Sequence, residues 1–172
     1  MDNNILIVDI ETTGLLPEKH EIIEIGAVNA STGETFEVKV YPLHIKEAQP
    51  EALKVNGYNK KDWEDAFLLP NALKLFSQFI GDNRPMMVAY NISFDRAFLE
   101  KAYKDCGMVY PFHYHHLDLL TLAWDRHWNR TACTSLKNLC TALNIPPEPP
   151  IHRAGTGAQK AFEVYKTLAP QK

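Results

Sequence analysis

Two acidic residues near the start of the chain have the type and spacing that metal-assisted hydrolysis requires. Asp9 and Glu11 end an apolar run and stand two residues apart. The period-2 geometry of a strand points both carboxylates to the same face, where they repel each other. Burial of such a pair is costly unless a cation or hydrogen-bond donors compensate. From the pair alone, a metal site and two carboxylates that face solvent are equally good interpretations.

The residues that follow this pair favour a site that contacts a nucleotide. Thr12 and Thr13 carry hydroxyls that can bond a sugar or a phosphate, and Gly14 permits close approach of the backbone. Leu15 can wedge against a base. We therefore predict that the loop after the first strand binds substrate.

The first two of three ordered motifs resemble those of a known family. Residues 9–15 (Asp-Ile-Glu-Thr-Thr-Gly-Leu) resemble the first motif of the DnaQ-like DEDD exonucleases. This family lies in the ribonuclease-H-like superfamily and includes the proofreading domains of DNA polymerase III epsilon. Residues 88–95 resemble the second motif, with Asn91, Phe94 and Asp95 in register. The resemblance implies that Asn91 and Phe94 contact the substrate.

Residues 150–158 (Pro-Ile-His-Arg-Ala-Gly-Thr-Gly-Ala) resemble the third motif of the family. In the family, a histidine here precedes the last acidic ligand by five residues. That histidine is His152, and it indicates the DEDDh branch. Segments 23–27 and 117–123 are also similar to the family, so the resemblance spans nearly the whole chain. One short motif is a weak signal, whereas three in order are specific.

The resemblance implies a metal-dependent 3′→5′ exonuclease that acts on single-stranded DNA or RNA ends. The implied cofactors are two divalent cations, Mg²⁺ or Mn²⁺. Asp9 is the implied bridging ligand, Glu11 completes the shell of one metal, and Asp95 acts on the second through water. His152 is the implied base toward the attacking water, a task that suits an imidazole pKa. The implied partners are a nucleic-acid 3′ end and a polymerase or other replication or repair protein.

Position 157 departs from the family pattern, because Gly157 stands where the last acidic ligand is expected. Loss of one of four carboxylates weakens the site of the metal that activates water, so we expect weak or no hydrolysis from this chain. Shifting the alignment does not remove the mismatch. The flanking residues that match the family are His152, Arg153, Ala154 and Ala158.

Two other acids are poor substitutes for the missing ligand. Glu163 lies six residues after Gly157, which rotates it away on a helix of 3.6 residues per turn. Asp118 is expected to play a supporting role. Two origins of the glycine stay open: an engineered or selected inactive form, or a natural pseudo-enzyme. The alternative function is accordingly a non-catalytic module that binds 3′ ends or a protein partner.

The elements that must position these residues form an α/β pattern. We predict a ribonuclease-H-like mixed sheet of five strands, with an antiparallel meander first and parallel strands after it, flanked by helices. The predicted strands are 5–10, 22–28, 35–40, 86–90 and 115–117, with a turn at 31–34. The predicted helices are 51–55, 70–80, 94–103, 119–126, 135–143 and 154–168. On the helix 94–103, we expect Phe94, Ala97, Phe98 and Ala102 to face the core.

Length and composition limit the class of protein. At 172 residues, with 45% apolar and 23% charged residues, the chain fits one exonuclease domain over residues 1–172. A formal net charge of −3 argues against a protein that coats long nucleic acid, but not against one that grips a strand end. No signal peptide and no window of about 18 apolar residues is present, so we expect a cytoplasmic protein.

Several other side chains are of types that can bind metal ions or stack against bases. Cys106, Cys133 and Cys140 are odd in number and lack CxxC spacing, so they are predicted to be small apolar fillers. The cluster 113–116 (His-Tyr-His-His) lacks ligand-like partners for zinc. For the tryptophans Trp63, Trp124 and Trp128, a core or partial-surface role is preferred over stacking against bases.

Overall fold

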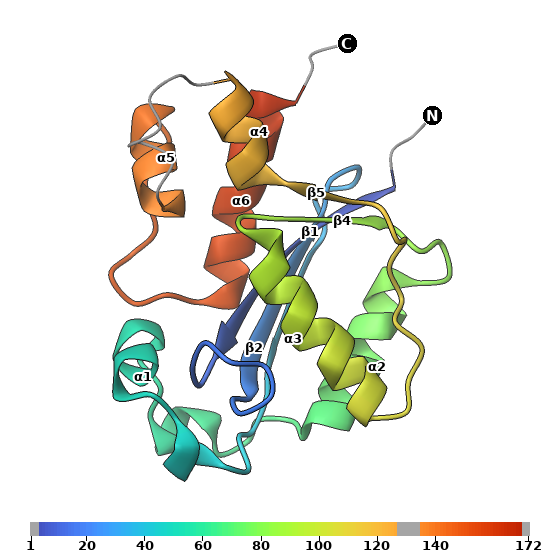
Figure 1. Cartoon of the computed structure of the whole chain (residues 1–172), viewed down its shortest axis with the longest axis vertical. Coiled ribbons are helices and arrows are strands. Elements are labelled where there is room, and N and C mark those ends of the chain that lie inside the picture. The colour runs from blue at the N-terminus through green and yellow to red at the C-terminus, as the bar shows by residue number, and fades with distance from the viewer. Residues whose placement is uncertain (1–3, 127–134, 170–172) are drawn as a thin grey trace.

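The computed structural model describes residues 4–126 and 135–169, and these residues contain a five-stranded mixed sheet (Figure 1). The strands lie in the order β3-β2-β1-β4-β5. β1 (Ile5–Thr12), β2 (Ile22–Asn29) and β3 (Thr35–Lys39) form an antiparallel meander. β4 (Met86–Ala89) pairs in parallel with β1, and β5 (His116–Asp118) pairs in parallel with β4. The predicted sheet is confirmed, with β5 displaced by one residue.

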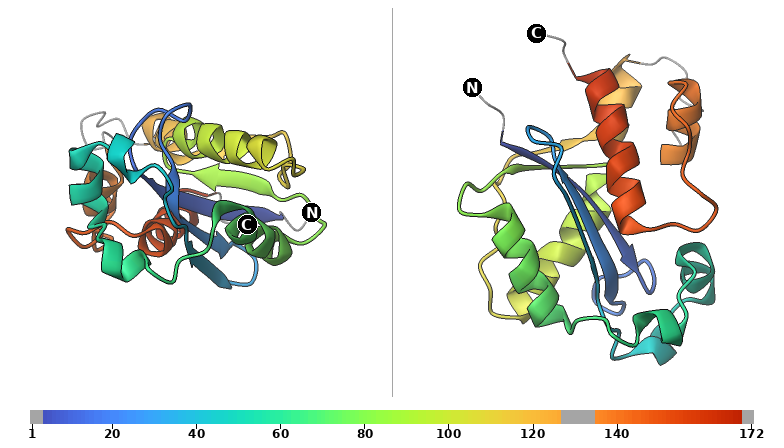
Figure 2. Two further views of the ribbon diagram at one scale, coloured as in Figure 1. Left: turned by 90° about the horizontal axis from the view of Figure 1, so that it is seen from below. Right: turned by 180° about the vertical axis from the view of Figure 1, so that it is seen from behind.

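Helices lie on both faces of this sheet (Figure 2). α2 and α3 contribute to the core on one face, while α4, α5 and α6 contribute to the core on the other. The helix bounds are α1 (Pro50–Asn56), α2 (Leu69–Ile80), α3 (Ile92–Asp105), α4 (Leu119–Arg126), α5 (Leu136–Ala142) and α6 (Ala154–Leu168), and two 3-10 helices are η1 (Ile45–Glu47) and η2 (Lys60–Trp63). None of the helices in the described ranges is long and apolar enough to cross a lipid bilayer.

β1 is the central strand and is buried on both faces, which explains its nearly continuous apolar sequence. Leu6, Val8 and Ile10 contact the core beneath α2 and α3. Ile5 and Ile7 contact the core beneath α6. Alternation along the strand therefore places residues 9 and 11 on the α6 face.

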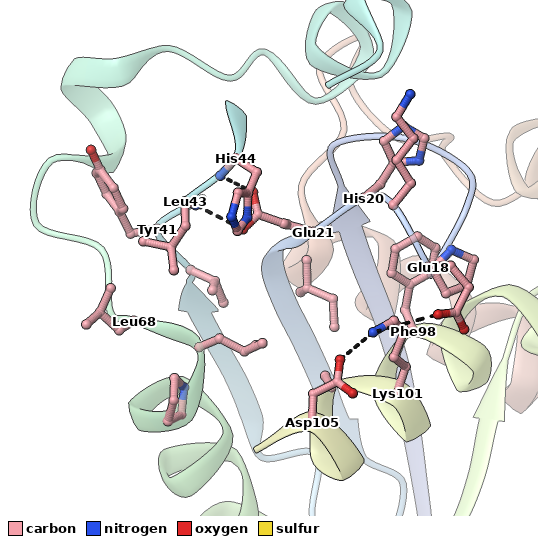
Figure 3. A pocket seen from close by; sticks show the side chains of 17 residues that line it. Glu18, His20, Glu21, Tyr41, Leu43, His44, Leu68, Phe98, Lys101 and Asp105 are labelled. Atoms are coloured by element: carbon pink, nitrogen blue, oxygen red, sulfur yellow. Dashed lines mark hydrogen bonds and ion pairs between the residues drawn. The ribbon is translucent and has the colours of Figure 1, made fainter. Parts of the chain in front are cut away.

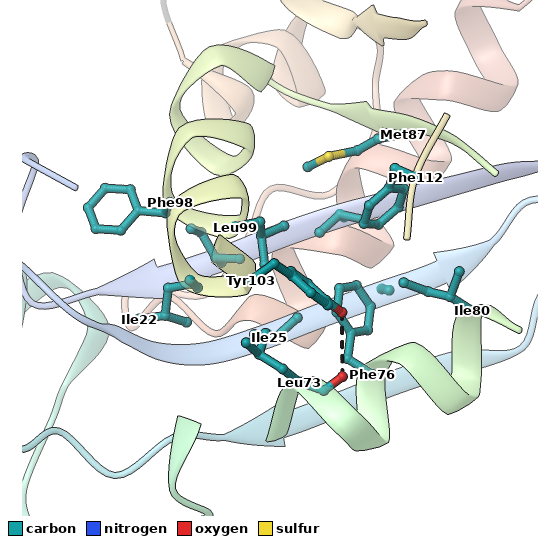
Figure 4. Close-up of a cluster of buried hydrophobic side chains, with 14 of the residues drawn as sticks. Ile22, Ile25, Leu73, Phe76, Ile80, Met87, Phe98, Leu99, Tyr103 and Phe112 are labelled. Carbon is teal, nitrogen blue, oxygen red and sulfur yellow. Dashed lines mark hydrogen bonds between the residues drawn. The ribbon is translucent and has the colours of Figure 1, made fainter. Parts of the chain in front are cut away.

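The core beneath α2 and α3 is rich in large rings (Figure 4). Phe76, Tyr103 and Phe112 are among the largest fully buried side chains, and the Tyr103 hydroxyl lies 2.9 Å from Ser77 Oγ. One prediction for α3 was wrong, because Ala97 is exposed. The buried stripe of α3 instead follows helical spacing through Ile92, Asp95, Phe98, Leu99, Ala102 and Tyr103.

Asp118, at the end of β5, fixes the start of α3. Its Oδ1 accepts hydrogen bonds from the backbone N–H groups of Asn91 at 2.9 Å and Leu120 at 3.2 Å. Its Oδ2 accepts from Thr121 Oγ1 at 2.8 Å. Asn91 precedes α3 in the left-handed region, with φ 61°. The Asp118 carboxylate thus ties the α3 and α4 starts to the sheet, which agrees with its expected supporting role.

The start of α6 lies directly against β2 because Gly26 leaves room for it. A Cβ at Gly26 would lie 2.1 Å from the backbone oxygen of Ala154. Beside it, the fully buried Glu24 accepts a hydrogen bond from the Ala154 N–H at 3.2 Å. A carboxylate at a helix N-terminus also interacts favourably with the helix dipole. These two contacts bring the segment around Gly157 next to β1.

Candidate active site

The predicted acidic residues and the predicted base line a single pocket at the carboxyl end of β1. Asp9 and Glu11 come from β1, Asp95 from the first turn of α3, and His152 from the loop before α6. The cavity volume is about 190 Å³. Its full lining is Asp9, Ile10, Glu11, Tyr90, Asn91, Phe94, Asp95, Leu136, Glu148 and His152. Residues from four distant segments of the chain therefore meet here, including the predicted substrate residues Asn91 and Phe94.

Asp95 is held inside the protein at the end of the sheet. Its side chain is buried, with 3% of the residue exposed, and its Oδ1 accepts from the Ile10 N–H at 3.1 Å. Burial raises the pKa of Asp95 to about 8, although hydrogen bonds from its own backbone and from Ile10 act in the opposite direction. The charge of Asp118 adds to the increase.

Asp9 has carboxylates as its electrostatic neighbours. Burial is the first cause that raises its pKa well above the ordinary value. The negative charges of Asp95, Glu11, Glu148 and Glu24 raise it further, in that order. The ionised form of Asp9 therefore needs positive charge nearby to be stable.

Glu11 is also buried among like charges, but the positive charge of Arg153 acts on it as well. Burial raises the pKa of Glu11 to about 8, followed by the charges of Glu24, Glu148 and Asp95. Arg153 lowers it, but as the weakest of the named causes. The carboxylates of this pocket are thus under-compensated by the protein itself.

This donor set fits a hard divalent cation, which prefers carboxylate oxygens and whose charge would offset the repulsion. In residues 4–126 and 135–169, no three His, Cys, Asp or Glu side chains already stand in the arrangement of a metal site.

His152 is positioned through its backbone. Its N–H donates to Val55 O at 3.0 Å, and the next residue, Arg153, donates from its guanidinium to Asn56 O at 2.6 Å. The loop is therefore fastened to the end of α1. The imidazole itself stays accessible, since 42% of the side chain is exposed. It can reach a water molecule or a substrate in the pocket.

Gly157 is buried in the first turns of α6, and oxygens of other residues occupy the space where its side chain would be. A Cβ at Gly157 would lie 2.2 Å from Asp9 Oδ2 and 3.0 Å from Glu148 Oε1. Glu148 was not among the predicted site residues. The signal for it was a single acid within the proline-rich run 145–150.

The hydroxyls of Thr12 and Thr13 form hydrogen bonds within the loop after β1. Thr12 Oγ1 donates to Gly14 O at 2.7 Å, and Thr13 Oγ1 accepts from the Glu21 N–H at 2.9 Å. Both residues are buried, so these hydroxyls stabilise the loop and do not line the carboxylate pocket. Leu15, in contrast, is 67% exposed and free to contact a ligand. Local spacing alone did not reveal that the loop would use its own hydroxyls.

A larger cavity, of about 510 Å³, lies elsewhere and is lined by none of the predicted site residues (Figure 3). It lies between the loop after β1, the segment after β3 and α3. Glu21 accepts the backbone N–H groups of Leu43 and His44 there, and Lys101 pairs with Glu18 at 3.9 Å and with Asp105. Lys101 offsets the charges of Glu18 and Asp105 there, so these carboxylates form ion pairs with a lysine, which no carboxylate of the smaller pocket does in the described parts of the chain.

The tryptophans and cysteines singled out in the sequence have mainly structural roles in the described parts of the chain. Trp63 is fully buried and donates its Nε1–H to Ile23 O at 3.0 Å, as preferred from the sequence. Trp124 is 52% exposed. Cys106 and Cys140 are free thiols. Trp128 and Cys133 lie outside the described residues.

Comparison with known proteins gives a family for nearly the whole chain. A family model described as exonuclease, RNase_T, matches residues 6–165. The PolC-type DNA polymerase III of Thermotoga maritima is 33% identical over 167 residues, which are 95% of this chain and 12% of that protein. That of Caldanaerobacter subterraneus is 34% identical over 113 residues, or 63% of this chain and 8% of that protein. The chain thus spans a small fraction of these curated relatives.

Solved structures with the same fold are exonucleases. Escherichia coli exonuclease I in complex with a 5cy-dT13 oligonucleotide has a TM-score of 0.78 and 16% identity, covering 96% of this chain and 41% of that chain. The nuclease domain of 3′hExo, a DEDDh family member bound to rAMP, has a TM-score of 0.69 and 19% identity, covering 96% of this chain and 88% of that chain. At these identities the similarity shows the fold, which is ribonuclease-H-like.

Proposed function

The chain belongs to the DnaQ-like exonuclease family, and on that premise we propose that it is a 3′→5′ exonuclease of the DEDDh type. It would hydrolyse phosphodiester bonds at single-stranded 3′ ends, with residues 1–172 acting as one catalytic domain. The observation that carries the proposal is the meeting of Asp9, Glu11, Asp95 and His152 around one pocket. These four residue types supply the cation ligands and the base that phosphodiester hydrolysis needs.

The carboxylates are assigned to two divalent cations, Mg²⁺ or Mn²⁺. Asp9, whose carboxylate is affected by the charges of both Asp95 and Glu11, would bind both cations, with Glu11 on one and Asp95 on the second. When bound, such cations place positive charge on the phosphodiester and lower the pKa of water. The repulsion that raises the pKa values of Asp9 and Glu11 supports this assignment, because bound cations remove it.

His152 is assigned the role of the general base, which accepts the proton of the attacking water. Its imidazole is accessible at the pocket edge, while its backbone is fixed by the bond to Val55 O. A general base must reach its proton within hydrogen-bonding distance and have a pKa near the working pH. The backbone of His152 is held in place, and its exposed imidazole can reach a water molecule in the pocket.

The apolar and amide side chains at the pocket are assigned to binding the 3′ end of the nucleic acid. Asn91 and Phe94 line it, and the exposed Leu15 projects from the loop after β1. Aromatic and apolar groups stack against bases with little sequence preference, which suits DNA or RNA. The PolC-type relatives make a polymerase or another replication or repair protein the proposed protein partner, in the cytoplasm.

We propose that turnover by this chain is weak because no carboxylate is attached at Gly157. The direct test is a 5′-labelled single strand incubated with Mn²⁺ and either this chain or a Gly157→Asp variant. Gel laddering that is stronger for the variant supports the exonuclease. Asp9→Asn in the Gly157→Asp background is the control, and it should abolish the ladder.

The same experiment separates the alternative function. If the Gly157→Asp variant binds a single strand but releases no nucleotides in Mn²⁺ or Mg²⁺, the catalytic proposal is wrong. A non-catalytic module for 3′ ends or for a protein partner then becomes the better description. Fluorescence anisotropy of the labelled strand measures binding independently of cleavage.

A further inference from the structure

We infer that Glu148 supplies the fourth carboxylate of the cation site, in place of the one missing at Gly157. This inference rests on the proposed metal-dependent function. It concerns a residue in the connector between α5 and α6, outside the three family motifs (Figure 1). The site would then keep four carboxylates for binding a cation. Turnover would stay weak because the Glu148 oxygen arrives from a different direction than one attached at position 157.

The first support is position. Glu148 Oε1 would lie only 3.0 Å from a Cβ at Gly157, and Asp9 Oδ2 would lie 2.2 Å from the same point. A side chain at position 157 would start in this space. The glutamate therefore brings an oxygen to the place from which an aspartate would have reached toward Asp9. The glycine is what makes the space available.

The second support is the way in which the Glu148 carboxylate is held. Its side chain is only 8% exposed and lines the same pocket as Asp9 and Glu11. No hydrogen bond to this carboxylate is formed by the described parts of the chain, and the imidazole Nδ1 of His152 lies 4.0 Å from it. Lys160 attracts it more weakly than His152. A carboxylate with so few partners at the pocket has oxygens available for a cation.

The third support is the rigidity of the connector. Prolines flank Glu148 on both sides at 146, 147, 149 and 150, and each fixes its φ near −65°. The connector starts at Ile145, whose N–H donates to Cys140 O at 2.8 Å. It ends at His152, whose N–H donates to Val55 O at 3.0 Å. A glutamate on such a segment reaches the pocket with little loss of backbone entropy.

The test is Mn²⁺ binding to the whole chain, measured by isothermal titration calorimetry without nucleic acid. Glu148→Gln keeps the shape and removes the charge, and it should weaken Mn²⁺ binding by at least about tenfold. The matched control is Glu163→Gln, which removes the same charge from α6, where Glu163 pairs with Lys160 at 3.1 Å. The control should leave the Mn²⁺ affinity unchanged.

A double-mutant cycle tests replacement of the missing ligand specifically. In the Gly157→Asp background, Glu148→Gln should change the Mn²⁺ affinity by less than about threefold, because the aspartate then supplies the oxygen. Wild-type affinity in Glu148→Gln would overturn the inference. So would an equal loss in both backgrounds, since it would show a role unrelated to position 157.

The outcomes also separate this inference from the proposed function. If Gly157→Asp binds Mn²⁺ and cuts DNA while Glu148→Gln binds Mn²⁺ like the wild type, only the role of Glu148 is lost. If none of the variants binds Mn²⁺, the metal-dependent function and the role of Glu148 both fail. Should Gly157→Asp not fold because of its contact with Asp9, the wild type and Glu148→Gln still decide the question.

Discussion

The Asp95 carboxylate accepts a hydrogen bond from the backbone N–H of Ile10 at 3.1 Å. This bond joins the first turn of α3 to β1 at the residue between Asp9 and Glu11. A side chain proposed to hold a cation therefore also fixes the geometry of the strand that carries the other two carboxylates. Structural and catalytic roles of Asp95 should accordingly be separable by the choice of substitution.

Asp95→Asn should retain the fold and lose hydrolysis, because an amide oxygen can still accept from Ile10 while the charge is gone. Asp95→Ala should also lose about 1–3 kcal/mol of unfolding free energy, since the buried N–H is left without its acceptor. Urea unfolding of both variants, beside cleavage assays in the Gly157→Asp background, measures the two effects. Equal stability of the alanine and asparagine variants would contradict the structural role.

Without divalent cations, the protein should lose stability as the pH rises from about 4.5 to about 8. Burial and like charges raise the pKa of Glu11 from 4.5 to about 8, and burial raises that of Asp95 from 3.8 to about 8. Such groups bind protons more tightly when folded, so deprotonation in this range favours the unfolded chain. Thermal unfolding in EDTA at several pH values measures the trend.

The control for this pH dependence is Glu11→Gln, which removes one of the titrating groups and should flatten the curve. Mn²⁺ should stabilise the wild type more at pH 8 than at pH 5, because cation binding competes with protons for the carboxylates. The raised pKa values would be refuted if, in EDTA, the melting temperature of the wild type rose between pH 5 and pH 8 while that of Glu11→Gln did not.

His152→Ala should slow hydrolysis by about 10²- to 10⁴-fold in the Gly157→Asp background, the usual range for loss of a general base. Mn²⁺ affinity and unfolding free energy should change little, because the imidazole is 42% exposed and the loop is held by backbone bonds. Single-turnover cleavage and calorimetry separate these effects. A comparable loss of Mn²⁺ affinity would assign the histidine to the cation instead.

Gly26→Ala should destabilise the protein by about 1–3 kcal/mol, because the new Cβ would meet the rigid backbone oxygen of Ala154 at 2.1 Å. The displaced start of α6 should also weaken Mn²⁺ binding. Gly155→Ala is the matched control, since its Cβ would meet only the Glu37 carboxylate. That side chain can move, so the control should be nearly neutral in thermal unfolding.

Leu15→Ala should weaken binding of a single-stranded oligonucleotide by about 1–3 kcal/mol if the side chain packs against a base. The free energy of unfolding of the variant should hardly change, because Leu15 is 67% exposed. Val109→Ala is the control, as Val109 is 85% exposed and does not line the pocket. Fluorescence anisotropy in Ca²⁺ measures binding, and equal affinities of the two variants would remove Leu15 from the substrate site.

The sequence by itself determined most elements, and it predicted four site residues that the structure brings to one pocket. The predicted helix 154–168 has the bounds of α6, because its stripe of small and apolar residues repeats with helical spacing over four turns. Asp9 and Glu11 share a face because strand geometry alternates side chains with a fixed period. These are local rules, and they hold wherever the segment lies in the fold.

Only the tertiary structure decided what fills the space at Gly157. Sequence spacing excluded Glu163 along the same helix, but it carried no information about Glu148, which arrives from the connector on the other side. The hydroxyls of Thr12 and Thr13 were likewise committed by contacts within a folded loop. Local periodicity fixes the direction of a side chain from its own backbone. The neighbour that it meets depends on how distant segments pack, and that depends on the whole chain.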